Sequence, residues 1–506
     1  MLVIDNKKDI TIYDVVDVAR DRMKVSLSEG AKAAIEKSRK FVDKILGTDG
    51  AVYGISTGFG EFAKISISPD QRTALQRNLI LSHCTGVGEF LPEDAVRAAM
   101  VLRVKSLAYG YSGIRLSTVE KLVEFINLGI TPAIPCKGSV GASGDLAPLS
   151  HIAAVLLGEG FVLENGSAVP AGIALKSAGI APLVLAAKEG LALINGTQIM
   201  TAIGVLACYD AEHMLKLADI AAALSLEALQ GTLAAFDPRI AQIRPHPGQA
   251  DCAENIRKLV EESEIMAGPY NKVQDAYSLR CTSQVHGASR EAWRRVGETL
   301  GFEMNAVTDN PIVMADTGEI ISGGNFHGQP IALVMDYLKI SVSEIGNISE
   351  RRINRLVDPH LSGLPAFLAT NGGVNSGMMI AQYTAAALVS ENKVLAHPAS
   401  VDSVPTSANQ EDHVSMGTIA ARQAAEILGN VRLVLAIELM AAAQGADFLN
   451  PSGLGRGTKA AYSCIRKAVA KLEDDRLLSP DIEAIHDIIL NESLVGVVEA
   501  EVGLLN

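Results

Sequence analysis

The sequence has few aromatic residues, which make up only 4% of its 506 residues, although 48% of the residues are hydrophobic. Alanine, leucine, isoleucine, valine and glycine therefore carry most of the apolar character. Small and straight-chain residues suit closely packed helices, because they lose little side-chain freedom in a helix. This composition argues against an aromatic-rich β-sandwich and predicts a mainly α-helical fold.

The sequence also lacks an excess of positive charge, and its net charge is −13. Nucleic acids and anionic membrane surfaces attract basic proteins, so we expect neither as a partner. The six cysteines are scattered and form no Cys-x-x-Cys pair, which indicates neither a disulfide framework nor a zinc ribbon.

Long uninterrupted apolar runs are missing as well. Two stretches carry no charged residue, 190–209 and 364–390, but Asn195 and Gln198 interrupt the first and a polar segment at 370–376 interrupts the second. A membrane-spanning helix needs about 20 predominantly apolar residues in a row. The first residues lack the pattern of a signal peptide. We therefore expect a soluble cytoplasmic protein.

The two parts of the chain differ in pattern near residue 200. Glycine and proline break up residues 1–200, whereas 201–506 contains long segments with apolar residues at three-and-four spacing. Long helices are expected at 197–235, 330–357, 375–397 and 411–447. Helices of this length predict a long central helical bundle preceded by a smaller N-terminal region. A further helix is expected from the Ser68-Pro69-Asp70 start signal to about Cys84.

A glycine-rich run from Lys137 to His151 contains the sequence Ala142-Ser143-Gly144. The simplest interpretation is a turn before a helix. Asp145 would then cap the helix, Pro148 would lie in its first turn, and 152–157 would belong to the core. The tripeptide alone is too common to indicate more than this.

The same turn can also carry chemistry. Gly144 has no Cβ, so its nitrogen can approach the carbonyl carbon of Ala142. Cyclisation with loss of two waters would then give a 4-methylidene-imidazol-5-one, whose exocyclic methylene carbon comes from Ser143. Such an electrophile requires no external cofactor, and a helix N-terminus just downstream would favour electron density flowing into it.

The run Gly-Ser-Val-Gly-Ala-Ser-Gly-Asp-Leu-Ala-Pro-Leu resembles the signature of the aromatic amino acid ammonia-lyase family, which includes histidine, phenylalanine and tyrosine lyases and related aminomutases. The resemblance spans nearly the whole chain. The other matching segments, in the family's order, are Tyr53–Gly60, Asn195–Gln198, Gln274–Arg280, Gly323–His327 and Ser349–Arg352.

The resemblance implies the methylidene imidazolone group and gives roles to individual residues. Tyr53 would be the base that removes the β-proton. Arg280 would bind the substrate carboxylate, a task that suits a planar guanidinium. Arg280 lies three residues after Tyr277, so the two would share one helix face. Residues around the electrophile and the substrate would be Asn195, Tyr277, Gln274 and Phe326.

Two segments favour L-histidine as the substrate. Ser82-His83 resembles the histidine-specific members, whereas phenylalanine lyases often have leucine in place of His83. The physical reason is that an imidazole ring forms hydrogen bonds, whereas a phenyl ring packs against an apolar wall. Glu411 stands where phenylalanine lyases usually have glutamine. It would accept a proton or hydrogen bond from the imidazole or the departing ammonium, or else be a simple helix N-terminal acid. The product would be trans-urocanate, in the first step of histidine degradation. The resemblance also implies a homotetramer with active sites shared between subunits.

Other functions remain open at this point. His327, His413, Glu411 and Asp412 could be imagined as metal ligands, but no local metal-binding spacing supports them, so no metal is expected. Gly323-Gly324 lacks the arrangement of a nucleotide-binding loop. A catalytically inactive helical scaffold is an alternative of another class. Within the family, the alternatives are a tyrosine or phenylalanine ammonia-lyase and a 2,3-aminomutase.

Overall fold

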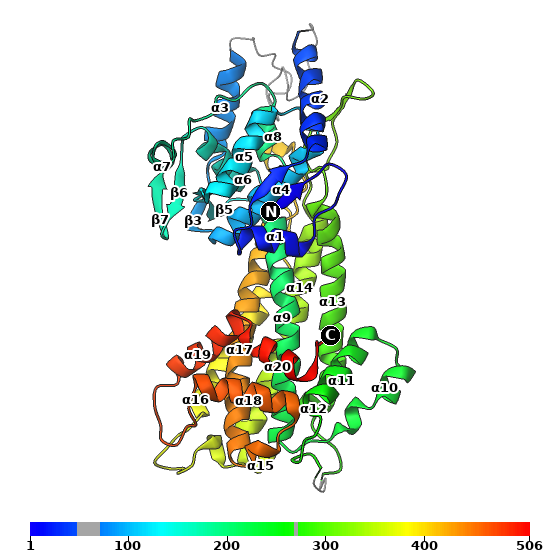
Figure 1. Cartoon of the computed structure of the whole chain (residues 1–506), viewed down its shortest axis with the longest axis vertical. Helices are drawn as coiled ribbons and strands as arrows, with labels where there is room; N and C mark the ends of the chain where they lie inside the picture. The colour runs from blue at the N-terminus through cyan, green and yellow to red at the C-terminus, as the bar shows by residue number, and fades with distance from the viewer. Residues whose placement is uncertain (48–70, 268–271) are drawn as a thin grey trace. The chain divides into compact units, whose positions relative to one another are not determined.

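The computed structural model describes residues 1–47, 71–267 and 272–506. The chain forms two compact units, each built from three stretches of sequence. Unit 1 contains Met1–Tyr209, Gly297–Asp336 and Pro398–Arg422, and unit 2 contains Asp210–Val296, Tyr337–His397 and Gln423–Asn506. Helices dominate both units (Figure 1), which confirms the predicted mainly α-helical fold. The division expected at residue 200 stays a prediction.

Four long helices contribute segments to both units. They are α9 (Gln198–Ala228), α13 (Thr282–Met304), α14 (Gln329–Val357) and α17 (Gly417–Asp447). Three of them correspond to the helices expected at 197–235, 330–357 and 411–447, although α9 ends at Ala228, seven residues before the expected end. However, α17 begins six residues later than expected, because the chain before Gly417 is a loop.

Unit 1 surrounds these segments with shorter helices and small sheets. Its helices are α1 (Ile12–Ala19), α2 (Glu29–Leu46), α3 (Arg72–His83), α4 (Glu93–Ala108), α5 (Leu116–Leu128), α6 (Leu146–Leu156), α7 (Ala171–Ser177) and α8 (Glu189–Ile194). Its strands are β1 (Leu2–Ile4), β2 (Val25–Leu27), β3 (Val87–Phe90), β4 (Thr131–Pro132), β5 (Pro135–Lys137), β6 (Phe161–Glu164), β7 (Ser167–Pro170), β8 (Ile312–Met314) and β9 (Glu319–Ile321). Strand β1 pairs with β2 in parallel, and the pairs β3–β5, β4–β6, β6–β7 and β8–β9 are antiparallel.

Helix α4 forms the core of unit 1, since every residue from Ala95 to Ala108 is buried. It packs against α1 and α5, while α3, α6 and α8 contact one another (Figure 1). A helix that is buried on all sides normally contains only apolar residues. Here Arg97, Arg103 and Lys105 are buried too, so their charged groups must find partners inside the protein.

In unit 2, the four long segments form a helical bundle that polar contacts hold together. Glu438 of α17 accepts hydrogen bonds from Ser225 of α9 at 2.7 Å and from Ser349 of α14 at 2.6 Å. Arg352 of α14 pairs with the same carboxylate, and both side chains are fully buried. The segment Ser349–Arg352, which resembles a family motif, is therefore part of the bundle core in this structure.

The remaining helices of unit 2 pack around this bundle (Figure 1). They are α10 (Pro238–Ile243), α11 (Pro247–Leu259), α12 (Tyr277–Arg280), α15 (Pro359–Ser362), α16 (Met379–Leu395), α18 (Arg456–Ala468), α19 (Ser479–Leu490) and α20 (Ser493–Val502). Helix α16 falls within the range expected at 375–397.

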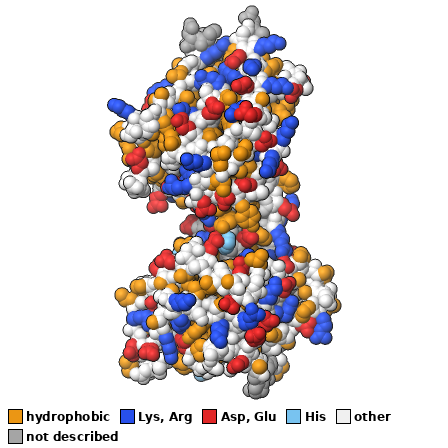
Figure 2. Space-filling view, in the orientation of Figure 1, with side chains coloured by type: hydrophobic (Ala, Val, Ile, Leu, Met, Phe, Trp, Pro, Cys, Tyr) orange, Lys and Arg blue, Asp and Glu red, His pale blue; other side chains and the backbone are white. Residues whose placement is uncertain are grey.

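Acidic and basic side chains are mixed over the face drawn in Figure 2, with no large region of one sign. Among the described residues, no helix has both the length and the apolar character that a membrane crossing requires.

Candidate active site

The Ala142-Ser143-Gly144 turn lies between β5 and α6, with Gly144 in the left-handed region at φ +73°. A Cβ added to Gly144 would lie only 2.1 Å from the carbonyl oxygen of Gly196, so only glycine fits there. The backbone of Asp145 donates to that same oxygen at 2.7 Å. The turn is thus held directly against the Asn195–Gln198 segment, another of the matching motifs.

Asn195 ends helix α8 and is 3% exposed. Its Nδ2 donates to the carbonyl oxygen of Asn310 at 3.1 Å. Its Oδ1 is buried and has no hydrogen-bond partner among the described residues. A buried acceptor without a donor is costly. This oxygen, one residue from the Gly196–Gly144 contact, is therefore available to a donor on a bound molecule.

Glu411 contacts the central residue of the turn. Ser143 Oγ donates to Glu411 Oε1 at 2.8 Å, and Thr406 Oγ1 donates to Glu411 Oε2, also at 2.8 Å. Backbone hydrogen bonds join residues 406 and 411 in both directions, and Ser407, Ala408 and Asn409 between them all have positive φ. Three such residues in a row are strained. The hydrogen bond from Thr406 and the backbone hydrogen bonds between residues 406 and 411 therefore hold the Glu411 carboxylate in place.

Because α17 begins at Gly417, Glu411 is not in the first turn of a helix. The alternative that Glu411 is only a helix N-terminal acid is therefore wrong. Its side chain instead reaches the turn that carries Ser143, which is 268 residues away in sequence.

His83 is the last residue of α3 and is partly buried. The start expected at Ser68 lies outside the described residues, but the end near Cys84 is confirmed. Burial lowers the pKa of His83, and the negative charge of Glu411 partly opposes this shift. Ser82 Oγ lies 3.1 Å from His83 Nδ1. Burial therefore favours the neutral form of the imidazole, which lies within electrostatic range of Glu411.

Phe326 lies in the loop between β9 and α14 and is partly buried. Two residues further on, a Cβ on Gly328 would lie 2.8 Å from Ser415 Oγ. Ser415 Oγ in turn donates to the carbonyl oxygen of Gly141 at 3.1 Å. The Phe326 loop, the segment before α17 and the Ala142-Ser143-Gly144 turn are thus neighbours in unit 1.

Three other predicted site residues belong to unit 2. Gln274 and Tyr277 are exposed, and the Arg280 guanidinium lies 4.7 Å from the centre of the Tyr277 ring. This contact confirms that Tyr277 and Arg280 share a face. Arg280 Nε is buried without a hydrogen-bond partner among the described residues. Tyr53, the predicted base, lies outside the described residues.

Some contacts that support the turn could not be predicted from the sequence. Asp145 occupies the N-cap position of α6, as expected, but its carboxylate makes no capping bond there. It accepts instead from Ser139, Thr418 and the backbone nitrogen of Met200. Asp145 is fully buried, and burial raises its pKa despite these donors. Thr406 was also missed, because a threonine in a polar loop gives no signal of its partner.

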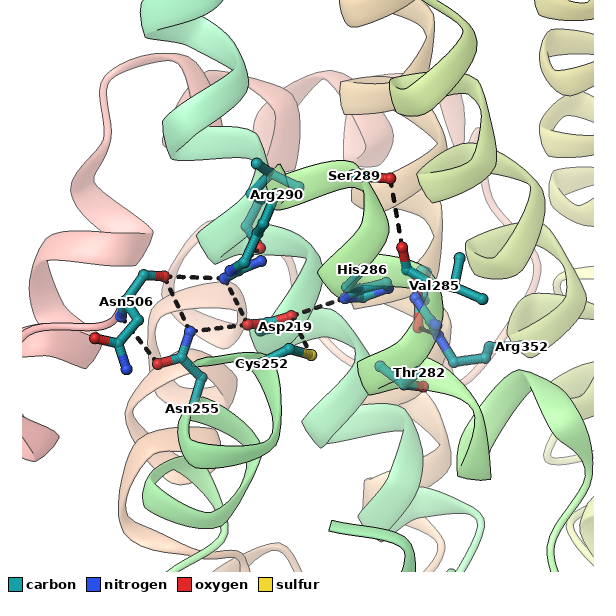
Figure 3. Close-up of polar contacts among 12 residues, drawn as sticks. Asp219, Cys252, Asn255, Thr282, Val285, His286, Ser289, Arg290, Arg352 and Asn506 are labelled. Carbon is teal, nitrogen blue, oxygen red and sulfur yellow. Dashed lines mark hydrogen bonds and ion pairs between the residues drawn. The ribbon is translucent and has the colours of Figure 1, made fainter. Parts of the chain in front are cut away.

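A second polar cluster lies in unit 2, where Asp219, Cys252 and His286 are close enough to suggest a metal site. Figure 3 shows the Asp219 carboxylate surrounded by donors. Arg290 and His286 both approach it to 2.7 Å, and Asn255 donates at 2.9 Å. Burial raises the pKa of the Cys252 thiol well above its ordinary value. A divalent ion would have to compete with Arg290 and ionise that thiol, so the donor set does not suit a metal.

The helical fold and the Ala-Ser-Gly turn beside a buried amide and a carboxylate suit the active site of an enzyme. A family model described as aromatic amino acid lyase matches residues 10–467, and the chain belongs to this family.

Individual relatives span the chain. Histidine ammonia-lyase from Alkaliphilus oremlandii is 55% identical over 504 residues, which cover 99% of each protein. The structure of histidine ammonia-lyase from Trypanosoma cruzi matches with a TM-score of 0.92 and 45% identity, covering 99% of this chain and 96% of that one. Tyrosine aminomutase from Streptomyces globisporus matches with a TM-score of 0.95 and 39% identity, covering 100% of both chains.

Proposed function

We propose that this protein eliminates ammonia from L-histidine without oxidation to give trans-urocanate, the first step of histidine degradation. The observation that carries this proposal is the position of Glu411, which bonds Ser143 and lies within electrostatic range of His83. A carboxylate and an imidazole are partners for the two nitrogens of the substrate ring, whereas a phenyl ring would leave both unpaired. The histidine ammonia-lyase relatives support the same substrate.

We further propose that Ala142, Ser143 and Gly144 form a 4-methylidene-imidazol-5-one and that no external cofactor takes part. The tripeptide fits this group, because Gly144 is left-handed and in contact with Gly196, where any other side chain would clash. The group supplies an electrophilic carbon that makes the substrate's ammonia a better leaving group. Asn195 Oδ1, buried and without a donor, accepts a hydrogen bond from the substrate amine.

The other residues act on the substrate directly. Arg280 binds the carboxylate through its planar guanidinium. Tyr277, whose ring lies against that guanidinium, helps to surround the electrophile and the substrate amine. Tyr53 removes the β-proton, Gln274 lies close to the substrate, and Phe326 packs beside the prosthetic group.

We propose a homotetramer in which subunits share active sites. In unit 2, α14 and α16 pack together, since Gln382 bonds Glu350 at 2.7 Å. Both helices carry large apolar residues on their exposed sides. An exposed apolar face of this kind is typical of an interface. Its residues are Tyr337, Ile340, Ile380, Tyr383 and Val394. A cytoplasmic location stays a prediction of the sequence.

One assay tests the substrate. The purified protein is incubated separately with L-histidine, L-tyrosine and L-phenylalanine, and each conjugated product is followed by absorbance and each β-amino acid by chromatography. We expect urocanate from histidine to dominate. Coumarate, cinnamate or a β-amino acid as the main product would instead show a tyrosine or phenylalanine lyase or an aminomutase. No product from any substrate would show an inactive scaffold.

A further inference from the structure

Arg103 of α4 is a buried cation close to the Ala142-Ser143-Gly144 turn. It is 1% exposed. Its Nη1 donates to the backbone oxygen of Asn195 at 2.9 Å and to Gln198 Oε1 at 2.7 Å, and its Nη2 donates to the backbone oxygen of Ala192. All three acceptors are uncharged. The guanidinium therefore holds the end of α8 and both ends of the Asn195–Gln198 turn at once.

Burying the Arg103 guanidinium without a bonded carboxylate costs electrostatic free energy. Burial lowers the pKa of Arg103 to about 10, even though the charge of Asp309 opposes the shift. Arg103 therefore stays protonated at neutral pH. Asp309 makes its own hydrogen bond with Lys188 at 2.8 Å, and both of these side chains are fully buried. A buried cation without a bonded carboxylate destabilises the fold unless its hydrogen bonds compensate. Buried charges of this kind are often found at functional sites.

Gly196 is confined between Arg103 and Gly144. A Cβ on Gly196 would lie 2.5 Å from Arg103 Nη1 and 2.4 Å from Gln198 Oε1. On the other side, the carbonyl oxygen of Gly196 is the atom that blocks any Cβ on Gly144. A displacement of Arg103 would therefore move Gly196, and with it the carbonyl oxygen that lies against Gly144.

We propose that Arg103 is a positioning residue for the cyclisation of Ala142, Ser143 and Gly144. In that reaction the Gly144 nitrogen bonds to the Ala142 carbonyl carbon, whose oxygen leaves as water with the protons of the Gly144 and Ser143 nitrogens. Ser143 then loses its Cα proton and its hydroxyl as a second water. Arg103 gives and takes no proton. It holds Gly196 so that Gly144 keeps the left-handed conformation in which ring closure occurs.

This inference rests on the proposed prosthetic group, and Arg97 offers a matched control. Arg97 is in the same helix, is 2% exposed, and donates only to backbone oxygens, those of Val18 at 2.9 Å and Ile126 at 3.1 Å. Neither acceptor belongs to the turn. Burial lowers its pKa as well. Arg103→Lys and Arg97→Lys should therefore weaken the fold in similar ways, but only the first should disturb Gly144.

The experiment measures the mass of the peptide that contains Ser143 at intervals after a pulse of protein synthesis, together with the Tm of each variant. Wild type and Arg97→Lys should lose two waters at the same rate, and Arg103→Lys should lose them about tenfold more slowly, the effect of about one hydrogen bond. A milder variant, Thr308→Val, removes the oxygen that accepts from Gln198 Nε2 at 2.8 Å and should slow the reaction by a smaller factor.

The outcomes separate the inference from the function on which it rests. No mass loss in the wild type would refute the prosthetic group itself. Mass loss at the wild-type rate in folded Arg103→Lys, or an equal delay in Arg97→Lys, would overturn the role of Arg103. If Arg103→Lys fails to fold, the rate of water loss in Thr308→Val tests the inference instead. An undelayed reaction in that variant would contradict the claim that the Asn195–Gln198 turn positions Gly144.

Discussion

Replacing His83 with leucine tests how the protein selects its substrate. On the proposed function, the imidazole of His83 makes a hydrogen bond to the substrate ring, close to the carboxylate of Glu411. Leucine removes this partner while keeping an apolar side chain of similar reach. The substrate nitrogen then remains unpaired in a partly buried site, whereas phenylalanine loses nothing.

The size of the effect follows from that unpaired group. Leaving a buried polar group without its partner costs about 1–3 kcal/mol, which corresponds to a factor of about 5 to 150. The ratio of kcat/KM for histidine over phenylalanine should therefore fall by this factor in His83→Leu. Ser82→Ala serves as a control, because it removes the 3.1 Å contact to His83 Nδ1 and the 3.0 Å hydrogen bond to the Leu79 carbonyl oxygen but keeps the imidazole. It should therefore change the ratio less.

The competing explanation is that His83 merely ends α3, where a cation near the helix C-terminus is favourable. On that explanation, His83→Leu would lower stability slightly and slow all substrates alike. The lowered pKa also gives a pH test. In the unfolded chain, His83 has the ordinary histidine pKa of 6.5. Below about pH 6.5 the unfolded chain therefore binds more protons at His83 than the folded chain does, so the free energy of unfolding falls as the pH drops. Burial also lowers the pKa of His151, His286 and His486, so His83→Leu should show a shallower decline in urea titrations rather than none. An unchanged substrate ratio would remove His83 from the specificity pocket.

Three further predictions follow from the site and the bundle. Ser143→Ala should abolish turnover without changing the fold or oligomer, and near-normal turnover would end the electrophile hypothesis. Arg280→Lys keeps the charge but loses the planar fork, so kcat/KM should fall by the equivalent of about 1–3 kcal/mol; an unchanged value would make Arg280 structural. Glu438→Gln leaves Arg352 buried without its counter-charge and should lower the free energy of unfolding by about 3–5 kcal/mol, whereas a loss below 1 kcal/mol in denaturant titrations would contradict the ion pair's role.

The long helices could be predicted from the sequence because their apolar spacing is regular and few residues break it. The helix expected at 330–357 is observed at Gln329–Val357. The prediction was poorer for residues 411–416. Their apolar and polar residues suit a helix, but the contacts of Glu411 with Thr406 and Ser143 hold this segment as a loop. Tertiary contacts outweigh local propensity in such a segment.

The site could be predicted only where residues lie within recognisable motifs. Ser143, Asn195 and Glu411 each lie in such a motif, and the structure brings all three into unit 1. Arg103 gave a weaker signal, one of three basic residues among the apolar residues of α4. Such a charge predicts a buried partner without saying which one, because the acceptors are backbone oxygens and a glutamine amide about 90 residues away in sequence. No residue pattern encodes a backbone acceptor.

The contact between Ser143 and Glu411 connects the formation of the proposed prosthetic group with its use. Before cyclisation, the Ser143 hydroxyl occupies Glu411 Oε1, and Thr406 occupies Oε2. On the proposed function, the second dehydration would remove the Ser143 oxygen altogether. Oε1 would then lose its donor, while Thr406 would still hold the carboxylate in place. A carboxylate that has lost a donor in a partly buried site binds a new donor more strongly. On the proposed function, the reaction that creates the electrophile would therefore also free the oxygen that accepts a hydrogen bond from the substrate. One fixed glutamate would then serve the immature and the mature site in turn.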